Sequence, residues 1–237
     1  MFKLILKTEI KNILRDRLYL FFVLYPIVFG TGGYFLVNWI KDTYPSSPWS
    51  AITAMMLIVV TGFIFGALIA FTLLDDKDDK VLISLKITPI SVKYYVYAKL
   101  LIGMIFGFVA SFILILTTNF LPNANIFVIL FVSILAAVQV PSVALIVNSF
   151  SSNKVEGFVI MKLSGMIILF PLIGFLVSGW TQYLLGIAPG YWAGRLIEIK
   201  LLPTEHGSPI LIFLIGLSYN ICATWLLMKL FTKKSNL

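Results

Sequence analysis

The sequence predicts an all-α integral membrane protein with six transmembrane helices, an N-terminal amphipathic interface helix and both termini in the cytoplasm. Sixty per cent of the 237 residues are hydrophobic, 12% are charged and the mean hydropathy is +1.01. Soluble domains carry about a quarter charged residues. Apolar stretches of about twenty residues, long enough to cross a bilayer, recur along the chain. The basic residues also gather in alternate loops, which is the pattern expected of the loops on the cytoplasmic side.

The charge-poor stretches are expected to be helices, because lipid offers the backbone no hydrogen-bond partners and each segment must satisfy its own. A turn containing Pro122 joins the third stretch to the fourth. The chain is too short for a separate soluble domain, so residues 1–237 are expected to form one transmembrane domain. The predicted spans are 18–40, 48–74, 100–118, 126–148, 163–178 with a few residues before it, and 209–228; the fifth is the least clearly bounded.

The orientation follows from the lysines and arginines. With the N-terminus inside, fifteen of the eighteen basic residues fall on cytoplasmic segments, leaving Lys41, Arg195 and Lys200 outside. A basic face toward anionic lipid headgroups accounts for the net charge of +8. We therefore expect this basic face to contact the lipid bilayer and not a nucleic acid.

Residues 1–17 have a helical period, with basic residues at intervals of four and apolar residues broadly on another side. Such a helix is expected to lie along the membrane surface. It serves either as a basic anchor that sets topology or as a surface for a soluble partner. The basic side comprises Lys3, Lys7, Lys11 and Arg15, and the apolar side Leu4, Leu6, Ile10, Ile13 and Leu14.

A charged segment, residues 75–95, interrupts the apolar pattern after the second span. Its aspartates are expected at the start of a short helix, 78–87, because carboxylates interact favourably with a helix N-terminus. The residue before a proline leaves the α region, which would end this helix. The alternative is a solvated charge run; the spacing lacks the central glycine of an EF-hand calcium loop. The residues expected to carry contacts are Asp75, Asp76, Asp78, Asp79, Val81, Leu82, Leu85, Thr88 and Pro89.

The spans contain no charged residue or histidine at mid-bilayer depth, which argues against an ion-coupled secondary transporter. The milder polar residues either hold helices together or line a pathway, and with the many aromatic residues they suit an amphipathic cargo. Glycines spaced four apart allow close helix contacts, either within one subunit or between two. The possible pathway residues are Thr61, Gln139, Asn148 and Asn220, and the packing glycines are Gly62, Gly66, Gly103 and Gly107.

The composition also excludes several chemistries. A membrane-embedded enzyme would need clustered carboxylates and histidines, whereas the chain has one histidine, His206, and one cysteine, Cys222. We therefore expect no catalytic residue and no metal site. No P-loop motif is present, so ATP is not expected to bind this chain. Residues 179–208, which contain Tyr191 and Trp192, are expected to form a re-entrant or interfacial segment on the outer side.

Two stretches resemble the permease subunits of type-2 ABC transporters, in particular exporters of fluoroquinolones and antimicrobial peptides. The first is the acidic stretch followed by "VLISLKITPIS" and an aromatic run ending at Lys99. The second is "VNSFSSNKVEGFVIMKLSG", which resembles the family's cytoplasmic turn between helices four and five. The sequence departs from the family at Lys80, where relatives often carry glycine, and in using aspartates where glutamates are common.

The resemblance implies a division of labour. This chain would form half of an export pathway for an amphipathic or hydrophobic cargo, such as a drug, an antimicrobial or cytolytic peptide, or a lipid-like molecule. A separate ABC ATPase would bind ATP and Mg²⁺, while this chain binds no cofactor. The helix 78–87 would be the coupling helix, and the N-terminal helix, through Lys7, Lys11 and Arg15, a second contact. The resemblance further implies a second permease copy or paralogue and the bacterial cytoplasmic membrane. The alternative is a non-transporting protein with the permease fold, acting in self-protection or sensing.

Overall fold

The computed structural model describes residues 2–87, 91–122, 124–177, 179–202 and 207–234. Over these ranges the chain is helical and contains no strand, so the predicted all-α class is confirmed. Six helical segments are long and apolar enough to cross a membrane, also as predicted. The helices are α1 Phe2–Arg15, α2 Arg17–Thr43, α3 Trp49–Asp78, α4 Val81–Ser84, α5 Val92–Thr118, α6 Ile126–Phe150, α7 Lys154–Gly165, α8 Leu169–Gly174, α9 Tyr191–Leu201 and α10 Pro209–Lys234, with 3-10 turns η1 Leu85–Ile87, η2 Met166–Ile168 and η3 Trp180–Ile187.

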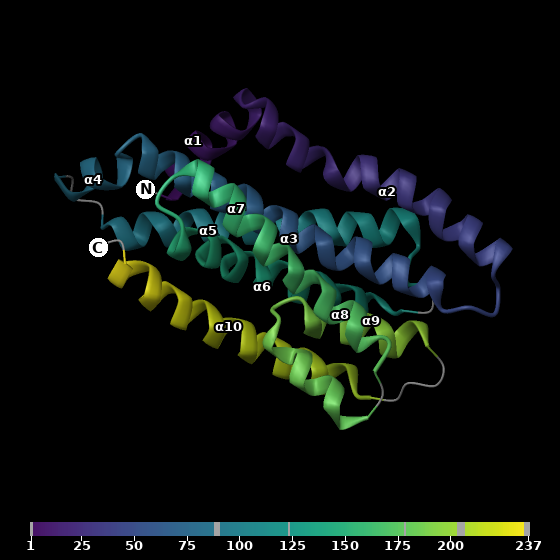
Figure 1. Cartoon of the computed structure of the whole chain (residues 1–237). Helices are drawn as coiled ribbons and strands as arrows, with labels where there is room; N and C mark the ends of the chain where they lie inside the picture. Colours follow the sequence, from purple (N-terminus) through teal and green to yellow (C-terminus); the bar gives the residue numbers. More distant parts are fainter. Residues whose placement is uncertain (1, 88–90, 123, 178, 203–206, 235–237) are drawn as a thin grey trace.

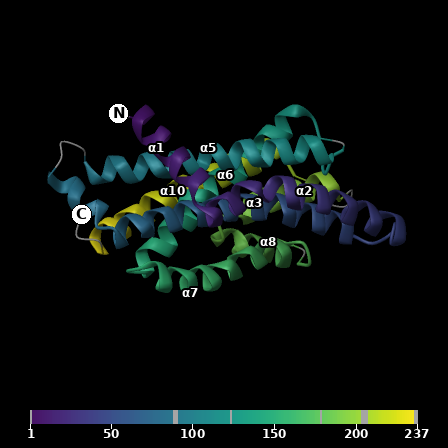
Figure 2. The ribbon, with the colours of Figure 1, turned by 90° about the horizontal axis from the view of Figure 1, so that it is seen from above.

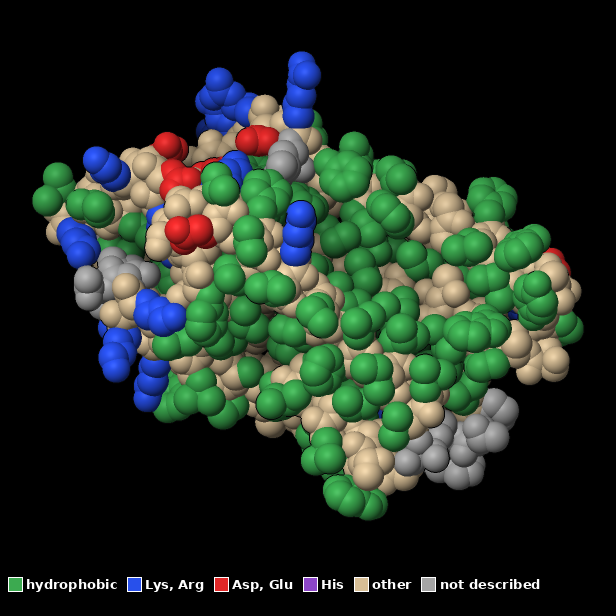
Figure 3. Space-filling view, viewed as in Figure 1, with side chains coloured by type: hydrophobic (Ala, Val, Ile, Leu, Met, Phe, Trp, Pro, Cys, Tyr) green, Lys and Arg blue, Asp and Glu red, His purple; other side chains and the backbone are tan. Residues whose placement is uncertain are grey.

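The long helices lie side by side in one elongated bundle (Figure 1). Both ends of the chain lie at the same end of the bundle, together with α1 and α4. We call this the terminal end. Seen from above, α5 and the α7–α8 segment flank α3 on opposite sides (Figure 2). Most of the lysines and arginines visible in the space-filling view gather at the terminal end, and apolar side chains cover the flank (Figure 3).

Helices α3 and α6 form the centre of the bundle. Most of their span residues are buried inside the protein, whereas α2 and α10 expose most of theirs. The exposed residues on α2 and α10 include large apolar side chains such as Phe35 and Leu226. Lipid is as apolar as these side chains, so this is the surface expected of peripheral membrane helices.

The fifth span, predicted to start a few residues before 163, begins at Lys154. The Asn153 side chain accepts a hydrogen bond from the Glu156 N–H, and the Glu156 carboxylate accepts one from the Ser152 N–H. This reciprocal cap satisfies donors at the helix start and sets where α7 begins. The span is then interrupted by η2, so it crosses as two helical pieces, α7 and α8.

The segment predicted to lie on the outer side, 179–208, has a part that lies inside the bundle. Helix α9 packs against α3, α6, α8 and α10, and residues 191–198 are all buried. Arg195, which the charge pattern places in an outer loop, is buried and donates to the Glu198 carboxylate at 2.8 Å. Residues 203–206, which include His206, lie outside the described residues.

The spaced glycines lie where helices of this one chain meet. Gly62 and Gly66 of α3 face α6, and Gly103 of α5 faces α3 and α6. Gly107 of α5 lies beside Ala137 of α6. The missing Cβ atoms let α3 and α5 approach α6 closely.

Replacing Gly62 with alanine is expected to destabilise the protein by about 3 kcal/mol, the upper end of the cost of overpacking. An added Cβ would overlap the Ala136 carbonyl oxygen and the Gln139 amide, and a backbone oxygen cannot turn aside. The matched control is Gly32→Ala on α2, where a Cβ meets nothing within 4 Å. Thermal unfolding in detergent compares the two. Equal melting temperatures for both variants would contradict the close α3–α6 contact.

Candidate coupling surface and the charge cluster beneath it

In the structure, the short helix of the predicted coupling segment begins at a later residue than the sequence predicts. Helix α3 continues through Asp78, so the acidic residues end a long helix instead of beginning a short one. The predicted helix start at residue 78 and the favourable N-terminal carboxylates are therefore wrong, whereas α4 and η1 together cover residues 81–87 and reach the predicted end. Asp79 follows α3, and Lys80 takes the left-handed conformation (φ 57°) that redirects the chain into α4. Carboxylates at a helix C-terminus face its partial negative charge, so cations must offset them.

The first such cation is Lys99, which is 1% exposed and lies among α1, α3 and α5. Its Nζ atom lies 3.1 Å from the Glu9 carboxylate and 2.5 Å from the Asp76 carboxylate. It also donates to the Thr72 carbonyl at 3.2 Å and lies 5.3 Å from the centre of the Tyr95 ring. Glu9 itself is 2% exposed. We call Glu9, Asp76 and Lys99 the buried charge cluster; it joins three helices through one ammonium group.

A second set of contacts joins α3 to α2 and α7. The Asp75 carboxylate accepts a hydrogen bond from the Tyr19 hydroxyl and lies 2.7 Å from the Lys154 Nζ atom. The Lys154 backbone N–H donates to the Asp78 carboxylate at 3.1 Å. Three of the four predicted aspartates therefore bind other parts of this chain, and only Asp79 has no ion pair or hydrogen bond from its side chain among the contacts that the structure describes.

Burial raises the pKa of the Glu9 carboxyl; the Lys99 ammonium lowers it, and the neighbouring Asp76 carboxylate raises it again, with a net upward shift. One cation faces two carboxylates in a largely buried site, so a proton on one carboxyl brings the cluster to neutrality. The folded protein therefore holds this proton more tightly than the unfolded chain does.

The stability of the protein is consequently expected to depend on pH through Glu9. The contribution of a raised pKa is complete below the unfolded value of 4.5 and is lost as the pH rises through the folded value. Lowering the pH from about 8 to about 5 should raise the melting temperature of the wild type relative to that of the Glu9→Gln variant, in which residue 9 cannot titrate. Parallel melting profiles for the two proteins would contradict the shifted carboxyl.

Segment α4–η1 presents a different apolar face from the predicted one. Leu82 is 5% exposed and belongs to the core at the terminal end, and Val81 and Leu85 are half-buried. The outward side chains are Ile83, 63% exposed, and Ile87, 91% exposed. We call Ile83 and Ile87 the isoleucine pair. Thr88 and Pro89 lie outside the described residues.

Helix α1 packs against α5 and α2 through Ile5, Glu9 and Ile13, which recur at intervals of four. Of the predicted apolar side, Ile13 is buried but Ile10 and Leu14 are exposed, so this face was only partly right. The Leu4 side chain lies outside the described side chains. The predicted contact residues Lys7, Lys11 and Arg15 are all exposed.

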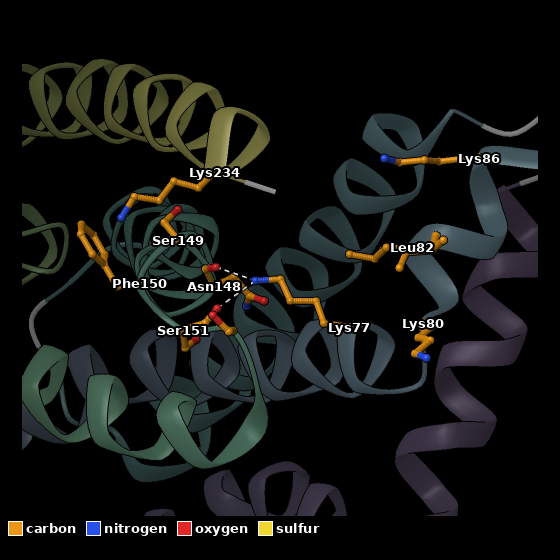
Figure 4. A pocket seen from close by; sticks show the side chains of 11 residues that line it. Lys77, Lys80, Leu82, Lys86, Asn148, Ser149, Phe150, Ser151 and Lys234 are labelled. Carbon is orange, nitrogen blue, oxygen red and sulfur yellow. Dashed lines mark hydrogen bonds between the residues drawn. The ribbon is translucent and has the colours of Figure 1, made fainter. Parts of the chain in front are cut away.

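Next to α4, a cavity of about 520 Å³ opens between the ends of α3, α6 and α10 (Figure 4). Lys77 reaches across from α3 and donates to the carbonyls of Asn148 at 2.6 Å and Ser151 at 3.2 Å. These carbonyls belong to the end of α6, where a cation is favourable. Figure 4 also labels Lys80, Lys86 and Lys234 around the cavity.

The four possible pathway residues each make a hydrogen bond to a backbone carbonyl. Thr61 donates to Leu57, four residues earlier in its own helix. The other three join different helices or segments: Gln139 donates to Val59, Asn148 to Ala70 and Asn220 to Pro189. These contacts hold the bundle together at the positions named, and a pathway role for the same residues stays a prediction.

Sequence reasoning missed Glu9, Lys99 as a buried cation, and the isoleucine pair. Glu9 carries a signal: it is an acidic residue in a basic helix, four residues from Ile5 and four from Ile13. That spacing places it on the packed face of α1. No comparable signal separates Leu82 from Ile83, because both are apolar. In the described part of the chain no three Asp, Glu, His or Cys side chains gather as metal ligands would.

The chain is similar to known proteins of one family. The family model for "Fluoroquinolones export permease protein Rv2686c-like" matches residues 9–228. Two Mycobacterium tuberculosis proteins, the fluoroquinolones export permease proteins Rv2686c (strain ATCC 25618 / H37Rv) and MT2760 (strain CDC 1551 / Oshkosh), are each 22% identical over 96% of this chain and 92% of their own length. No solved structure matches the chain.

Proposed function

Because the chain belongs to the Rv2686c-like family of fluoroquinolone export permeases, we propose that it is the membrane-spanning subunit of an ATP-driven exporter. In this proposal it forms half of the translocation pathway, and a second copy or a paralogue forms the other half. A separate ABC ATPase binds ATP and Mg²⁺ and docks on the terminal end. That end faces the cytoplasm of a bacterial cell, as the distribution of lysines favours.

The isoleucine pair is the observation that carries the proposal. Two large apolar side chains, 63% and 91% exposed, project from a short helix at the polar end of the bundle, beside the exposed Lys86. Apolar anchors surrounded by charges are typical of a protein contact, where the anchors supply affinity and the charges set orientation and association rate. Leu82 fixes the opposite side of α4 in the core.

The ion pairs at the end of α3 provide a route by which an ATPase docked on α4 would move the membrane-spanning helices. Only Asp79 and Lys80 separate α4 from α3, and α3 packs against the central α6 and against α5. The buried charge cluster ties the end of α3 to α1 and α5, and Asp75 ties it to α7 through Lys154. A displacement of α4 is therefore passed to several spans together, which is what a switch between inward and outward access requires. Exposed Lys7, Lys11 and Arg15 on α1 offer a second contact.

The proposed cargo is amphipathic or hydrophobic: a drug, an antimicrobial or cytolytic peptide, or a lipid-like molecule. An apolar cavity of about 400 Å³ lies between η2, η3, α6, α8 and α10, lined by residues that include Phe170, Tyr219 and Leu226. Its size is within the range of small-molecule sites, about 300–1,000 Å³. The names of the mycobacterial relatives, which refer to fluoroquinolone export, agree with a cargo of this kind.

The test is a mild-detergent purification of the tagged chain from its native cells, combined with a measurement of fluoroquinolone accumulation in cells with and without the chain. Co-purification of an identified P-loop ATPase, with higher accumulation when the chain is deleted, supports the exporter. An unchanged accumulation and no ATPase in several detergents would leave the non-transporting alternative as the better account.

A further inference from the structure

Lys162 is a cation inside the fifth membrane span. The span runs from Lys154 to Gly174, whereas the charge pattern assigns Lys162 to a cytoplasmic segment. The Lys162 side chain is exposed, and among the residues that the structure describes no ion pair joins its ammonium group to a carboxylate. The side chains one turn to either side, Phe158 and Met166, are apolar. The described part of the chain therefore supplies no counter-charge at Lys162.

Three packed helices mark the middle of the bundle. Gly107 of α5 lies beside Phe65 of α3 and Ala137 of α6. Each of these residues is close to the middle of its own membrane span. Their common level is therefore the level expected for the centre of a bilayer, whose hydrocarbon core extends about 15 Å to either side.

Contacts between α7 and α3 place Lys162 near this level. Gly157 of α7 lies beside Phe71, and Gly165 lies beside Phe63, so the stretch of α3 between these two contacts includes the central level. Lys162 precedes Gly165 by three residues, about 4.5 Å along the helix. Its backbone is thus closer to the centre of the bilayer than to the headgroups. The prediction that the spans carry no charged residue at mid-bilayer depth is wrong at Lys162.

The face of the fifth span that carries Lys162 is exposed and otherwise apolar, while the other side of α7 packs against α3 and α6. A charged residue in a span is costly against lipid and usually faces a water-filled cavity or the interior of a bundle. A chain that forms half of a pathway would present such a face to the pathway. The exposed apolar residues that recur at helical intervals on this face are Val155, Phe158, Val159, Met166, Leu169 and Ile173.

We propose that Lys162 lines the translocation pathway and that its ammonium group binds the carboxylate of an amphipathic cargo. This role rests on the proposed function, in which the single chain is half of the pathway. One ammonium group balances one negative charge, and such a pair is strong where water is scarce. A lipid phosphate stays at the headgroup level, about 15 Å from the centre, and does not reach this depth. Phe158 and Met166 contact the apolar part of the cargo.

The first test compares the binding of norfloxacin, a fluoroquinolone with a carboxylate, with that of its primary carboxamide, which has the same rings and no carboxylate charge. Equilibrium dialysis uses the purified full chain in phosphatidylcholine vesicles. The wild type is expected to bind norfloxacin at least about tenfold more tightly, since the carboxamide lacks the hydrogen bond between charged groups. Equal affinities would overturn the proposal. Displacement of norfloxacin by added phosphatidylglycerol would also overturn it, in favour of a lipid headgroup.

Variants assign the preference to Lys162. Lys162→Met should lower the norfloxacin affinity about tenfold and leave the carboxamide affinity within about twofold. Lys162→Arg should retain the preference. The matched control, Lys233→Met, removes the same charge from an exposed position at the end of α10 and should retain the preference as well. Equal weakening of both compounds by Lys162→Met would overturn the proposal, because it would show a structural role.

A second measurement asks whether water reaches position 162. Lys162→Cys, in a chain that also carries Cys222→Ala, is treated in open membrane fragments with a charged, membrane-impermeant thiol reagent. The control in the same background is Ile221→Cys, because Ile221 is 60% exposed near the middle of α10. Position 162 should react and position 221 should not, since the reactive thiolate forms in water and not in lipid. No reaction at position 162, or equal reaction at both, would overturn the pathway position.

Transport separates the role of Lys162 from the proposed function. ATP-driven uptake of the two compounds is measured in inside-out vesicles from the native cells, with the wild-type chain or Lys162→Met. Uptake with the same carboxylate preference in both would overturn the role of Lys162 and leave the exporter standing. Binding that depends on Lys162 without ATP-driven uptake would support the carboxylate site and contradict the exporter.

Discussion

Replacing Lys99 with methionine is expected to lower the free energy of unfolding by about 3–5 kcal/mol, the cost of removing one partner from a buried ion pair. The Lys99 ammonium is the partner of both the Glu9 and the Asp76 carboxylates, and Lys99 is 1% exposed. Without it, the Glu9 and Asp76 carboxylates would share a largely buried site with no ammonium group between them. The measurement is thermal or denaturant unfolding of the purified chain in detergent.

The control removes the charges together. The triple variant Glu9→Gln, Asp76→Asn and Lys99→Met leaves no buried charge in the cluster and is expected to recover most of the lost stability, because replacing a buried ion pair as a whole is often nearly neutral. A Lys99→Met variant as stable as the wild type would show that the cluster does not hold α1, α3 and α5 together.

Replacing the isoleucine pair by Ile83→Asp with Ile87→Asp is expected to reduce ATPase co-purification by more than about tenfold, since apolar anchors at the centre of an interface each contribute about 2 kcal/mol or more. Both side chains are exposed, so folding and membrane insertion should be unchanged. Co-purification of an identified P-loop ATPase, normalised to the amount of tagged chain, gives the measurement.

The matched control for this variant is Tyr44→Asp with Ser46→Asp, which adds the same two charges at exposed positions in the loop after α2, at the other end of the bundle. It should leave ATPase co-purification unchanged. Leu82→Asp is a poorer test, because Leu82 is buried in the core and its replacement would disturb folding. Full retention of the ATPase by the Ile83→Asp and Ile87→Asp variant would move the contact away from α4.

The spans were predictable because length and hydropathy decide them without knowledge of the fold. The position where α3 ends was not predictable from local sequence. Asp75, Asp76 and Asp78 carry negative charges, which are unfavourable at the C-terminus of a helix. They are tolerated there because Lys99 and Lys154, distant in sequence, lie beside Asp76 and Asp75. Such compensation depends on tertiary contacts, which a local rule does not contain.

The sequence predicted the correct segment for the candidate site, but not which of its side chains face outward. The predicted anchors Val81, Leu82 and Leu85 are buried or half-buried, and the exposed side chains are Ile83 and Ile87. Which apolar residue of α4 points outward depends on the direction in which the chain leaves α3, and the left-handed Lys80 sets that direction. The coupling role of the segment stays a prediction, as do the roles of the N-terminal helix and the pathway residues.

The most direct test of the account places a photo-crosslinking residue at position 83 or 87 in separate variants, and in a control variant at position 44 at the other end of the bundle. Crosslinking is performed in native membranes, and the adducts are identified by mass spectrometry. The account predicts an adduct with a P-loop ATPase from position 83 or 87 and none from position 44. A chain that is inserted and active in export but gives no ATPase adduct from position 83 or 87 would contradict it.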